Sequence, residues 1–111
     1  MSRLLIVGAG GHGAVVAEAA AAAGDWEKIE FLDDNPTSSE VLGFPVIGTV
    51  GDMTANLDES TAVLIALGNN SRRLELLERT AGAGGRLATV VHPSAQISRS
   101  ATIGAGGVVF A

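Results

Sequence analysis

The feature that most constrains the fold is a glycine-rich turn, residues 8–13, between an apolar run and an alanine-rich stretch. Its spacing, G-x-G-x-x-G, binds diphosphates where a strand precedes the turn and a helix follows it. In that setting Gly8 permits the tight turn, Gly10 lets a diphosphate approach the backbone, and Gly13 lets the helix pack closely on the strand. The first N–H groups of the helix would also favour phosphate. Taken alone, the same spacing is compatible with a turn that binds nothing.

Apolar runs typical of strands alternate with segments typical of helices along most of the chain. Strands are predicted at residues 4–7, 29–32, 46–47, 62–67 and 87–91. Helices are predicted at residues 12–23, at 51–57 (short and weak) and from about 70 to 81. This alternation predicts an α/β fold, a Rossmann-like parallel sheet with flanking helices, over residues 1–90.

The last predicted helix has a cap and an apolar face that can be named. Asn70 or Ser71 can cap its start. Leu74, Leu77 and Ala81 recur at helical spacing, so we expect their face to be buried.

Polar clusters follow two of the predicted strands. Asp33 lies about 20 residues after Gly13, the spacing of the acidic residue that hydrogen-bonds a ribose in dinucleotide-binding folds, and Asp34 follows at once. Residues 68–70, Gly-Asn-Asn, follow another strand. An Asx turn and a helix cap are the structural alternatives for these two clusters. Because carboxyl ends of parallel strands share one edge, both clusters and the glycine turn predict a nucleotide site there.

A different period begins near residue 91. Large apolar and small residues each recur every six positions, at Val91, Ile97, Ile103 and Val109 and at Ala95, Ala101 and Gly107. A period of six predicts a left-handed hexapeptide β-helix, in which one coil takes roughly 18 residues. Residues 91–111 would form its first coil. Since such coils need neighbours to bury their apolar faces, we expect the rest of this domain to lie beyond Ala111.

Composition excludes several classes of function. The formal net charge is −5, basic residues are scattered and aromatic residues are few, so nucleic-acid binding is not expected. No stretch approaches the roughly 20 apolar residues of a membrane span. Without cysteine and with two histidines, the chain offers no thiolate zinc site or histidine-rich metal site. We therefore expect a soluble, cytoplasmic protein that binds no metal.

At this point the chain resembles a known family, the hexapeptide-repeat sugar acyltransferases of the bacillosamine N-acetyltransferase and sialic acid O-acetyltransferase type. The segments that carry the resemblance run in the family's order and are residues 6–13, 31–34, 43–48, 65–70 and 91–95. Together they cover nearly the whole chain, and they are specific in combination rather than one by one.

The resemblance implies that the Rossmann-like domain binds a UDP-amino-sugar rather than NAD. By position, the residues expected to contact this ligand are Gly10, Gly11, His12, Asp33, Asp34, Gly68 and Asn69. Asp33 and Asp34 would hold the uridine part, and a buried, hydrogen-bonded role is the alternative for His12. One departure is Ala14, where many relatives carry a lysine. Loss of that cation would weaken phosphate binding or change the preferred ligand.

The resemblance also implies a reaction that this chain cannot complete. Family members transfer acetyl from acetyl-CoA to a sugar amine or hydroxyl, with a β-helix histidine as general base. Acetyl-CoA lies between the β-helices of neighbouring subunits in a homotrimer. The catalytic histidine should fall beyond Ala111, and His92 is interpreted as structural. We therefore predict that the isolated chain binds nucleotide-sugar and catalyses nothing.

Two other functions remain open from the residues. The glycine turn and Asp33 fit an NAD-binding domain of an oxidoreductase on spacing alone, although the six-residue repeat argues against it. A non-catalytic module, whose β-helix segment mediates oligomers, would oligomerise without nucleotide affinity.

Overall fold

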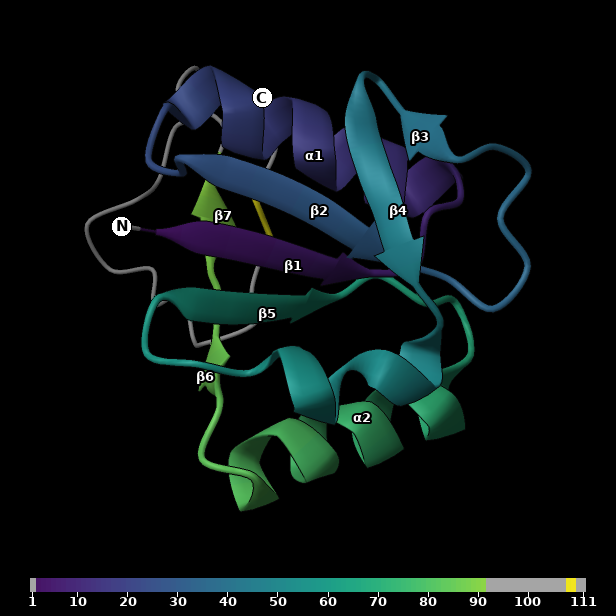
Figure 1. Ribbon diagram of the computed structural model, residues 1–111, viewed down its shortest axis with the longest axis vertical. Helices are drawn as coiled ribbons and strands as arrows, with labels where there is room; N and C mark the ends of the chain where they lie inside the picture. The colour runs from purple at the N-terminus through teal and green to yellow at the C-terminus, as the bar shows by residue number, and fades with distance from the viewer. Residues whose placement is uncertain (1, 92–107, 110–111) are drawn as a thin grey trace.

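The computed structural model describes residues 2–91 and 108–109. The described residues form three layers, with a central sheet between helices on both faces (Figure 1). The repeat positions Ile97 and Ile103, the predicted structural role of His92 and most of the predicted β-helix coil lie outside the described residues.

The central sheet has six strands in the order β3-β4-β2-β1-β5-β6. Their bounds are β1 Arg3–Val7, β2 Lys28–Leu32, β3 Glu40–Val41, β4 Phe44–Gly48, β5 Thr61–Ile65 and β6 Arg86–Leu87. All neighbouring strands are parallel except β3, which pairs antiparallel with β4. The predicted, mostly parallel sheet is confirmed, while the two-residue edge strand β3 had no signal in the apolar pattern.

The two faces of β1 serve two separate cores. Leu4 and Ile6 pack on the face covered by α1 (Gly11–Ala23), while Leu5 and Val7 pack on the opposite face. All four side chains are fully buried, which explains why β1 is apolar at every position rather than at alternate ones. Full burial of each aliphatic side chain contributes about 1.5–3 kcal/mol, so this strand is the centre of the fold.

Helix α1 packs on the sheet through small side chains. Ala17, Ala19 and Ala20 are buried there, so the helix can approach the sheet closely. The helix ends at Gly24, whose φ of +73° is left-handed and whose N–H donates to the Ala20 carbonyl at 3.3 Å. The predicted helix and its glycine stop are therefore confirmed.

Two short 3-10 turns lie on the opposite face, η1 (Val50–Asp52) and η2 (Thr54–Asn56). The single weak helix predicted at residues 51–57 is wrong. Asp52 Oδ2 accepts from the backbone N–H of Thr49 at 2.8 Å, which closes a capping box over only three residues. Backbone bonds between residues three apart, such as Met53 N–H to the Val50 carbonyl at 3.2 Å, then continue the tighter winding.

Helix α2 (Asn70–Gly82) covers the same face but in a different phase from the one predicted. Leu76 and Thr80 are buried, whereas Leu74 is 57% exposed and Ala81 is also exposed. The Thr80 hydroxyl donates to the Leu76 carbonyl at 2.8 Å, so it can face the core without an unsatisfied polar group. Of the predicted face, only Leu77 is partly buried against this core, and Thr80 takes a place that the pattern assigned to an apolar residue.

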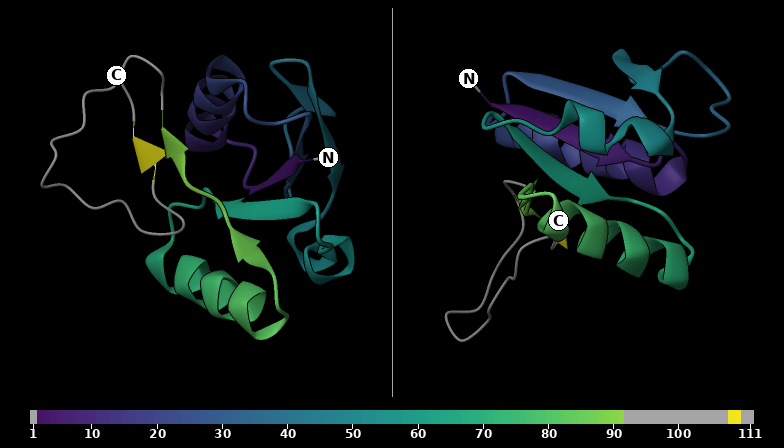
Figure 2. Two further views of the ribbon diagram at one scale, coloured as in Figure 1. Left: turned by 90° about the vertical axis from the view of Figure 1, so that its left-hand side faces the viewer. Right: turned by 60° about the horizontal axis from the view of Figure 1, so that its bottom comes forward.

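The last predicted strand, residues 87–91, divides between two sheets. Its first part is β6, while β7 (Val90–Val91) pairs in parallel with β8 (Val108–Val109). Figure 2 shows β7 beside the yellow β8, with α1 close to this second sheet. Because β6 ends at Leu87 and β7 begins at Val90, the prediction of one continuous strand is wrong. Val90 is buried in the α1 core.

Candidate functional site

The three polar clusters predicted from the sequence meet at one edge of the sheet. Strands β2, β1 and β5 are adjacent and parallel, so the segments that follow Leu32, Val7 and Ile65 leave the sheet on the same side. Strand β1 lies at the centre, and the chain builds β2 on one side of it and β5 on the other. Such a reversal of direction is where open α/β sheets bind ligands.

Two glycines of the turn are required by the fold itself. Gly8 has a φ of +112°, and its N–H donates to the Leu32 carbonyl at 2.7 Å. A Cβ there would lie 2.7 Å from the Ala66 carbonyl oxygen. A Cβ on Gly13 would collide with the Gly8 carbonyl, so the start of α1 passes directly over the turn. Both positions therefore have the close packing that a phosphate-binding turn needs.

The next positions of the turn are open rather than crowded. A Cβ on Gly10 or Gly11 would have no heavy atom within 4 Å among the described residues. Gly10 is the N-cap of α1 and makes no side-chain cap bond, so the first N–H groups of α1 are not capped by that residue. His12 is exposed on the first turn of the helix. The N–H groups at a helix N-terminus can hold an anion, and a turn without side chains lets the anion come close.

Asp33 links the glycine turn to the end of β2. Its Oδ2 accepts from the Ala9 N–H at 2.7 Å, and its Oδ1 accepts from the Asn35 N–H at 2.8 Å. Each carboxylate oxygen keeps one further lone pair for a ligand. The predicted Asx turn is therefore present at Asp33, and the same carboxylate fixes the position of the turn backbone.

Asp34 points to the other side, toward the start of α2. Its Oδ1 accepts from the Val50 N–H at 2.9 Å, and its Oδ2 lies 4.0 Å from Nη2 of Arg72. A cleft of about 370 Å³ opens between these groups. Its lining residues are Asp33, Asp34, Asn35, Val50, Leu67, Gly68, Asn69 and Arg72. Small-molecule sites have volumes of about 300–1,000 Å³, so this cleft is large enough for part of a nucleotide.

A neighbouring cleft of about 510 Å³ shares the two carboxylates. It runs from Asp33 and Asp34 along the loop of residues 36–39 to the end of β4. The acidic pair therefore stands between two hollows, one toward α2 and one toward β4. Both hollows lie at the carboxyl edge of the sheet.

Asn69 caps helix α2. Its Oδ1 accepts from the Arg72 N–H at 2.9 Å, so the predicted cap at Asn70 or Ser71 is wrong by one or two residues. The cap lies earlier in the chain than the pattern suggested, and Asn69 has the extended backbone of a cap. Asn69 can still offer a ligand the second lone pair of this oxygen and its amide NH₂ group.

Sequence reasoning missed four residues of the α2-side cleft. They are Asn35 from a loop, Val50 from a 3-10 turn, Leu67 from the segment after β5 and Arg72 from the first turn of α2. Val50 had no signal, because a single apolar residue in a loop has no period. Arg72 had a weak one, since a cation in the first turn of a helix opposes the helix dipole.

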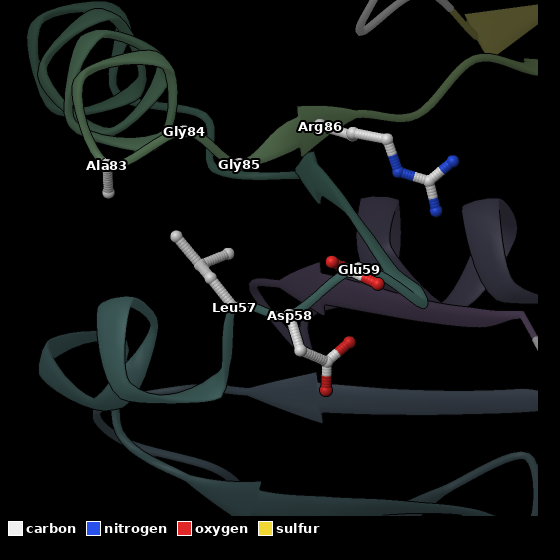
Figure 3. A pocket seen from close by; sticks show the side chains of 7 residues that line it. All are labelled: Leu57, Asp58, Glu59, Ala83, Gly84, Gly85 and Arg86. Carbon is white, nitrogen blue, oxygen red and sulfur yellow. The ribbon is translucent and has the colours of Figure 1, made fainter.

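A third hollow, of about 430 Å³, lies at the opposite edge of the sheet. Figure 3 shows Asp58 and Glu59 on the loop that leads into β5, across from the Gly84-Gly85 turn and Arg86. Hydrogen bonds from the hydroxyls of Thr61 and Ser60 lower the pKa of Asp58 below 3.8. None of the predicted site residues lines this hollow.

The described residues exclude two further features. No group of three or more histidine, cysteine or acidic side chains among them is arranged to hold a metal ion. Within the same part of the chain, no helix is both long enough and apolar enough to span a membrane.

Comparison with known families shows to which family the clusters at the carboxyl edge belong. Residues 3–80 match the PglD N-terminal domain. The chain belongs to this family. The matched range contains the glycine turn, the acidic pair and the Gly68-Asn69 cluster, so the complete edge described above is part of a PglD N-terminal domain.

The relatives of this PglD N-terminal domain are sugar acetyltransferases. Over 113 residues it is 38% identical to UDP-N-acetylbacillosamine N-acetyltransferase from Bacillus subtilis (strain 168), covering 100% of this chain and 52% of that protein. The acetyltransferase domain of PglB from Neisseria gonorrhoeae FA1090, in complex with acetyl coenzyme A, is 47% identical, with a TM-score of 0.88. That match covers 98% of this chain and 53% of the PglB chain.

A second solved structure contains a nucleotide-sugar. PerB from Caulobacter crescentus, in complex with CoA and GDP-perosamine, is 32% identical, with a TM-score of 0.84 and coverage of 100% of this chain and 52% of PerB. The chain thus spans about half the length of the relatives it matches. The family inferred from the sequence is confirmed, and these relatives give no support to the oxidoreductase alternative.

Proposed function

We propose that this chain is the nucleotide-sugar-binding part of an acetyl-CoA-dependent amino-sugar N-acetyltransferase. The observation that carries the proposal is the meeting of the glycine turn, the acidic pair and the Gly68-Asn69 cluster around clefts at the switch point of the sheet. The relatives support it, because one is named for a UDP-sugar and another was solved with a GDP-sugar. A UDP-amino-sugar is the ligand we propose here.

In this arrangement each part of the ligand meets a different element. The diphosphate lies over Gly10 and Gly11 at the N-terminus of α1, where a Cβ on either glycine would meet open space. The ribose lies beside Asp33, whose carboxylate keeps acceptor capacity after its two backbone bonds. The nucleoside end extends toward Asp34 and Gly68, and His12 stands on the side of the phosphates and the sugar.

Acetyl transfer itself is assigned to the part of the protein that the resemblance places beyond Ala111. There the sugar amine attacks the thioester carbonyl of acetyl-CoA, the C–S bond breaks, CoA leaves as the thiol, and a histidine takes the proton from the amine. We propose that the whole protein is a homotrimer. Because acetyl-CoA and nucleotide-sugars are intracellular metabolites, we also propose a cytoplasmic location.

The short second sheet supports a β-helix domain following this one. Val90 pairs with Val108, and Val91 with Val109, so the parallel pairing returns after one predicted coil of roughly 18 residues. We therefore propose that residues 1–90 form the binding domain and that residues 91–111 begin a left-handed hexapeptide β-helix.

Calorimetric titration of the 111-residue chain with UDP, a UDP-amino-sugar and NAD tests the proposal. We expect saturable binding of both uridine ligands and none of NAD. Gly68→Val places a side chain at a position that lines the cleft, and it should weaken binding at least about tenfold, as expected when a pocket is filled. Gly82→Val, at the far end of α2, is a matched control because a Cβ there also meets open space.

Three outcomes would count against the proposal. Binding of NAD alone would assign the chain to the oxidoreductase class. Binding of no nucleotide, together with self-association, would favour the oligomerisation module. Equal affinity of the Gly68→Val variant and the wild type would place the ligand somewhere other than this cleft.

A further inference from the structure

The cleft beside α2 lies at the place where the base of a bound nucleotide would be. Its walls come from the end of β2, the start of η1 and the segment that joins β5 to α2. If the diphosphate lies at the turn and the ribose at Asp33, the next group along the ligand is the base. This step rests on the proposed function above.

Apolar walls suit a flat ring. Val50 is buried, and the Leu67 side chain packs near the glycine turn, its Cδ2 lying 3.0 Å from the position of a Cβ on Gly8. Gly68 leaves open space between these walls and the mouth of the cleft. A base inserted here would lie against the partly buried Leu67 and would present its polar edge to the charged groups at the mouth.

The charged groups at the mouth are one carboxylate and one guanidinium, which form an ion pair without a direct hydrogen bond. Asp34 Oδ2 and Arg72 Nη2 are 4.0 Å apart, which is too far for a direct hydrogen bond. Asp34 is fixed by the bond from Val50 N–H to its other oxygen at 2.9 Å. Arg72 is fixed by Glu75, whose Oε1 lies 3.3 Å from Nη1. Each residue thus keeps one polar end directed at the other across a gap.

The stability of α2 does not account for the position of Arg72. A cation in the first turn of a helix opposes the helix dipole, and α2 has no acidic residue in that turn to compensate. The opposing carboxylates come instead from Asp34, outside the helix, and from Glu75 on the next turn. The unfavourable position of Arg72 relative to the helix dipole is therefore better explained by a contact that its guanidinium makes in the cleft.

We propose that Asp34 and Arg72 together recognise the base by its adjacent C=O and N–H groups. The Arg72 guanidinium donates to the carbonyl, and the Asp34 carboxylate accepts from the neighbouring ring N–H. Uracil presents this order at O4 and N3–H, and guanine presents it at O6 and N1–H. Cytosine and adenine carry an amino group in place of the carbonyl and an unprotonated ring nitrogen beside it, which reverses the order.

The reversal matters because the ligand cannot turn over. With the diphosphate at the glycine turn and the ribose at Asp33, the base enters in one orientation, so donor and acceptor are compared position by position. A reversed edge would place an amino group against the donors of Arg72 and a lone pair against the Asp34 carboxylate. A site with charged partners left unpaired in this way rejects the wrong ligand strongly.

Calorimetric titration of the 111-residue chain with UDP, GDP, CDP and ADP tests this pair. We expect UDP and GDP to bind, and CDP and ADP to bind at least about tenfold more weakly, the discrimination typical of one bidentate contact to a base edge. In Arg72→Gln a neutral amide, which both donates and accepts, replaces the guanidinium. That variant should bind UDP more weakly and lose most of the preference for UDP over CDP.

Arg73→Gln is the matched control, because Arg73 is an exposed neighbour on the same turn of α2. It removes the same charge and should keep the UDP-to-CDP ratio of the wild type. Circular dichroism of each variant shows whether α2 is intact, and if Arg72→Gln does not fold, the wild-type ratio still decides.

The failures of the two proposals are distinguishable. Equal binding of all four nucleotides by the wild type would overturn base recognition by this pair and leave the proposed function standing. An Arg72→Gln variant that keeps the wild-type ratio of UDP affinity to CDP affinity would also overturn base recognition by this pair and leave the proposed function standing. Binding of none of the four would overturn the proposed function and this inference together.

Discussion

The backbone N–H of Ala9 donates a 2.7 Å hydrogen bond to Oδ2 of Asp33, which ties the glycine turn after β1 to the end of β2. The other oxygen of the same carboxylate holds the Asn35 N–H at 2.8 Å. Asp33 is thus a positioning residue for the turn, whatever it also gives to a ribose. Asp34, its neighbour, accepts one backbone hydrogen bond, from the Val50 N–H, and is more exposed.

Substitution of the two aspartates should therefore have unequal effects on stability. Asp33→Ala leaves two backbone N–H groups without their charged acceptor, and we expect the free energy of unfolding to fall by about 1.5–3 kcal/mol. Asp34→Ala loses one such bond at an exposed site and should cost no more than about 1 kcal/mol. Urea denaturation followed by circular dichroism measures both values. Equal losses would show that the link between Ala9 and Asp33 does not stabilise the turn.

Two glycines of one turn should respond to alanine in opposite directions. Gly13→Ala drives a Cβ into the Gly8 carbonyl, so the backbone must move, and we expect a loss of about 3 kcal/mol or more. Gly11→Ala meets open space at the start of α1, where alanine restricts the unfolded chain more than glycine does. It should raise the free energy of unfolding by about 0.4–1 kcal/mol.

Thermal unfolding of both glycine variants against the wild type gives the measurement. If the proposed function is right, Gly11→Ala also weakens UDP binding, because the new methyl group lies where the diphosphate would approach. A Gly11→Ala variant that is more stable and binds UDP as tightly as the wild type would remove Gly11 from the site.

The β3–β4 hairpin carries a leucine where the backbone favours asparagine or glycine. Both residues of its two-residue loop have positive φ, +52° at Leu42 and +82° at Gly43, which is the pattern of a type I′ turn. Leu42 is 60% exposed, so little packing offsets the strain. Leu42→Asn should stabilise the chain by about 1 kcal/mol, within the cost of a left-handed non-glycine residue.

The control for the hairpin is Gly43→Ala, which introduces a Cβ at a positive φ and should destabilise the chain by a similar amount. Denaturant titration of both variants checks the two signs. A lower stability for Leu42→Asn would indicate that the exposed leucine makes a contact worth more than the backbone strain.

Asp58 predicts a pH dependence of stability at the opposite edge of the sheet. Hydrogen bonds from Thr61 and Ser60 lower the pKa of its carboxyl below 3.8, so folding favours the ionised form. Its contribution is therefore complete above the pKa of the unfolded chain and is lost as the pH falls through the lower pKa of the folded chain. The stability difference between wild type and Asp58→Asn should be constant near neutral pH and shrink below 3.8.

Urea midpoints of both proteins across that range give the profile. A difference that does not change with pH would mean that the ionised carboxylate is not what Thr61 and Ser60 stabilise. UDP binding should be the same in both proteins, because Asp58 lies at the edge of the sheet away from the glycine turn.

Much of the architecture could be predicted from local patterns. The apolar β1, the glycine turn and the alanine-rich α1 all follow from residues close in sequence, and each is present in the structure. The predictions were wrong where contacts between residues far apart in the sequence decide which side of an element is buried. The phase of α2 depends on Leu76 and Thr80 facing the sheet, and no apolar period includes a threonine that bonds to its own helix.

The candidate site divides in the same way. The sequence predicted Asp33, Asp34 and Gly68 because glycine turns and acidic pairs at strand ends have recognisable spacing. It did not predict that Val50 and Arg72 would complete the cleft, because these two residues come from separate elements that only the folded sheet brings together. The family match spans residues 3–80 and therefore contains every residue of the cleft.

By itself, the sequence determined which strands are buried and where the chain turns, because strand burial and glycine conformation are set by local chemistry. It also determined the family, through the order of the segments that carry the resemblance. Tertiary structure decided the rest. Asp33 bonds to Ala9, and Asp34 faces Arg72, only because parallel pairing of β1 with β2 and β5 brings three strand ends to one edge. Those contacts join residues far apart in the chain, so their geometry depends on the register of the whole sheet.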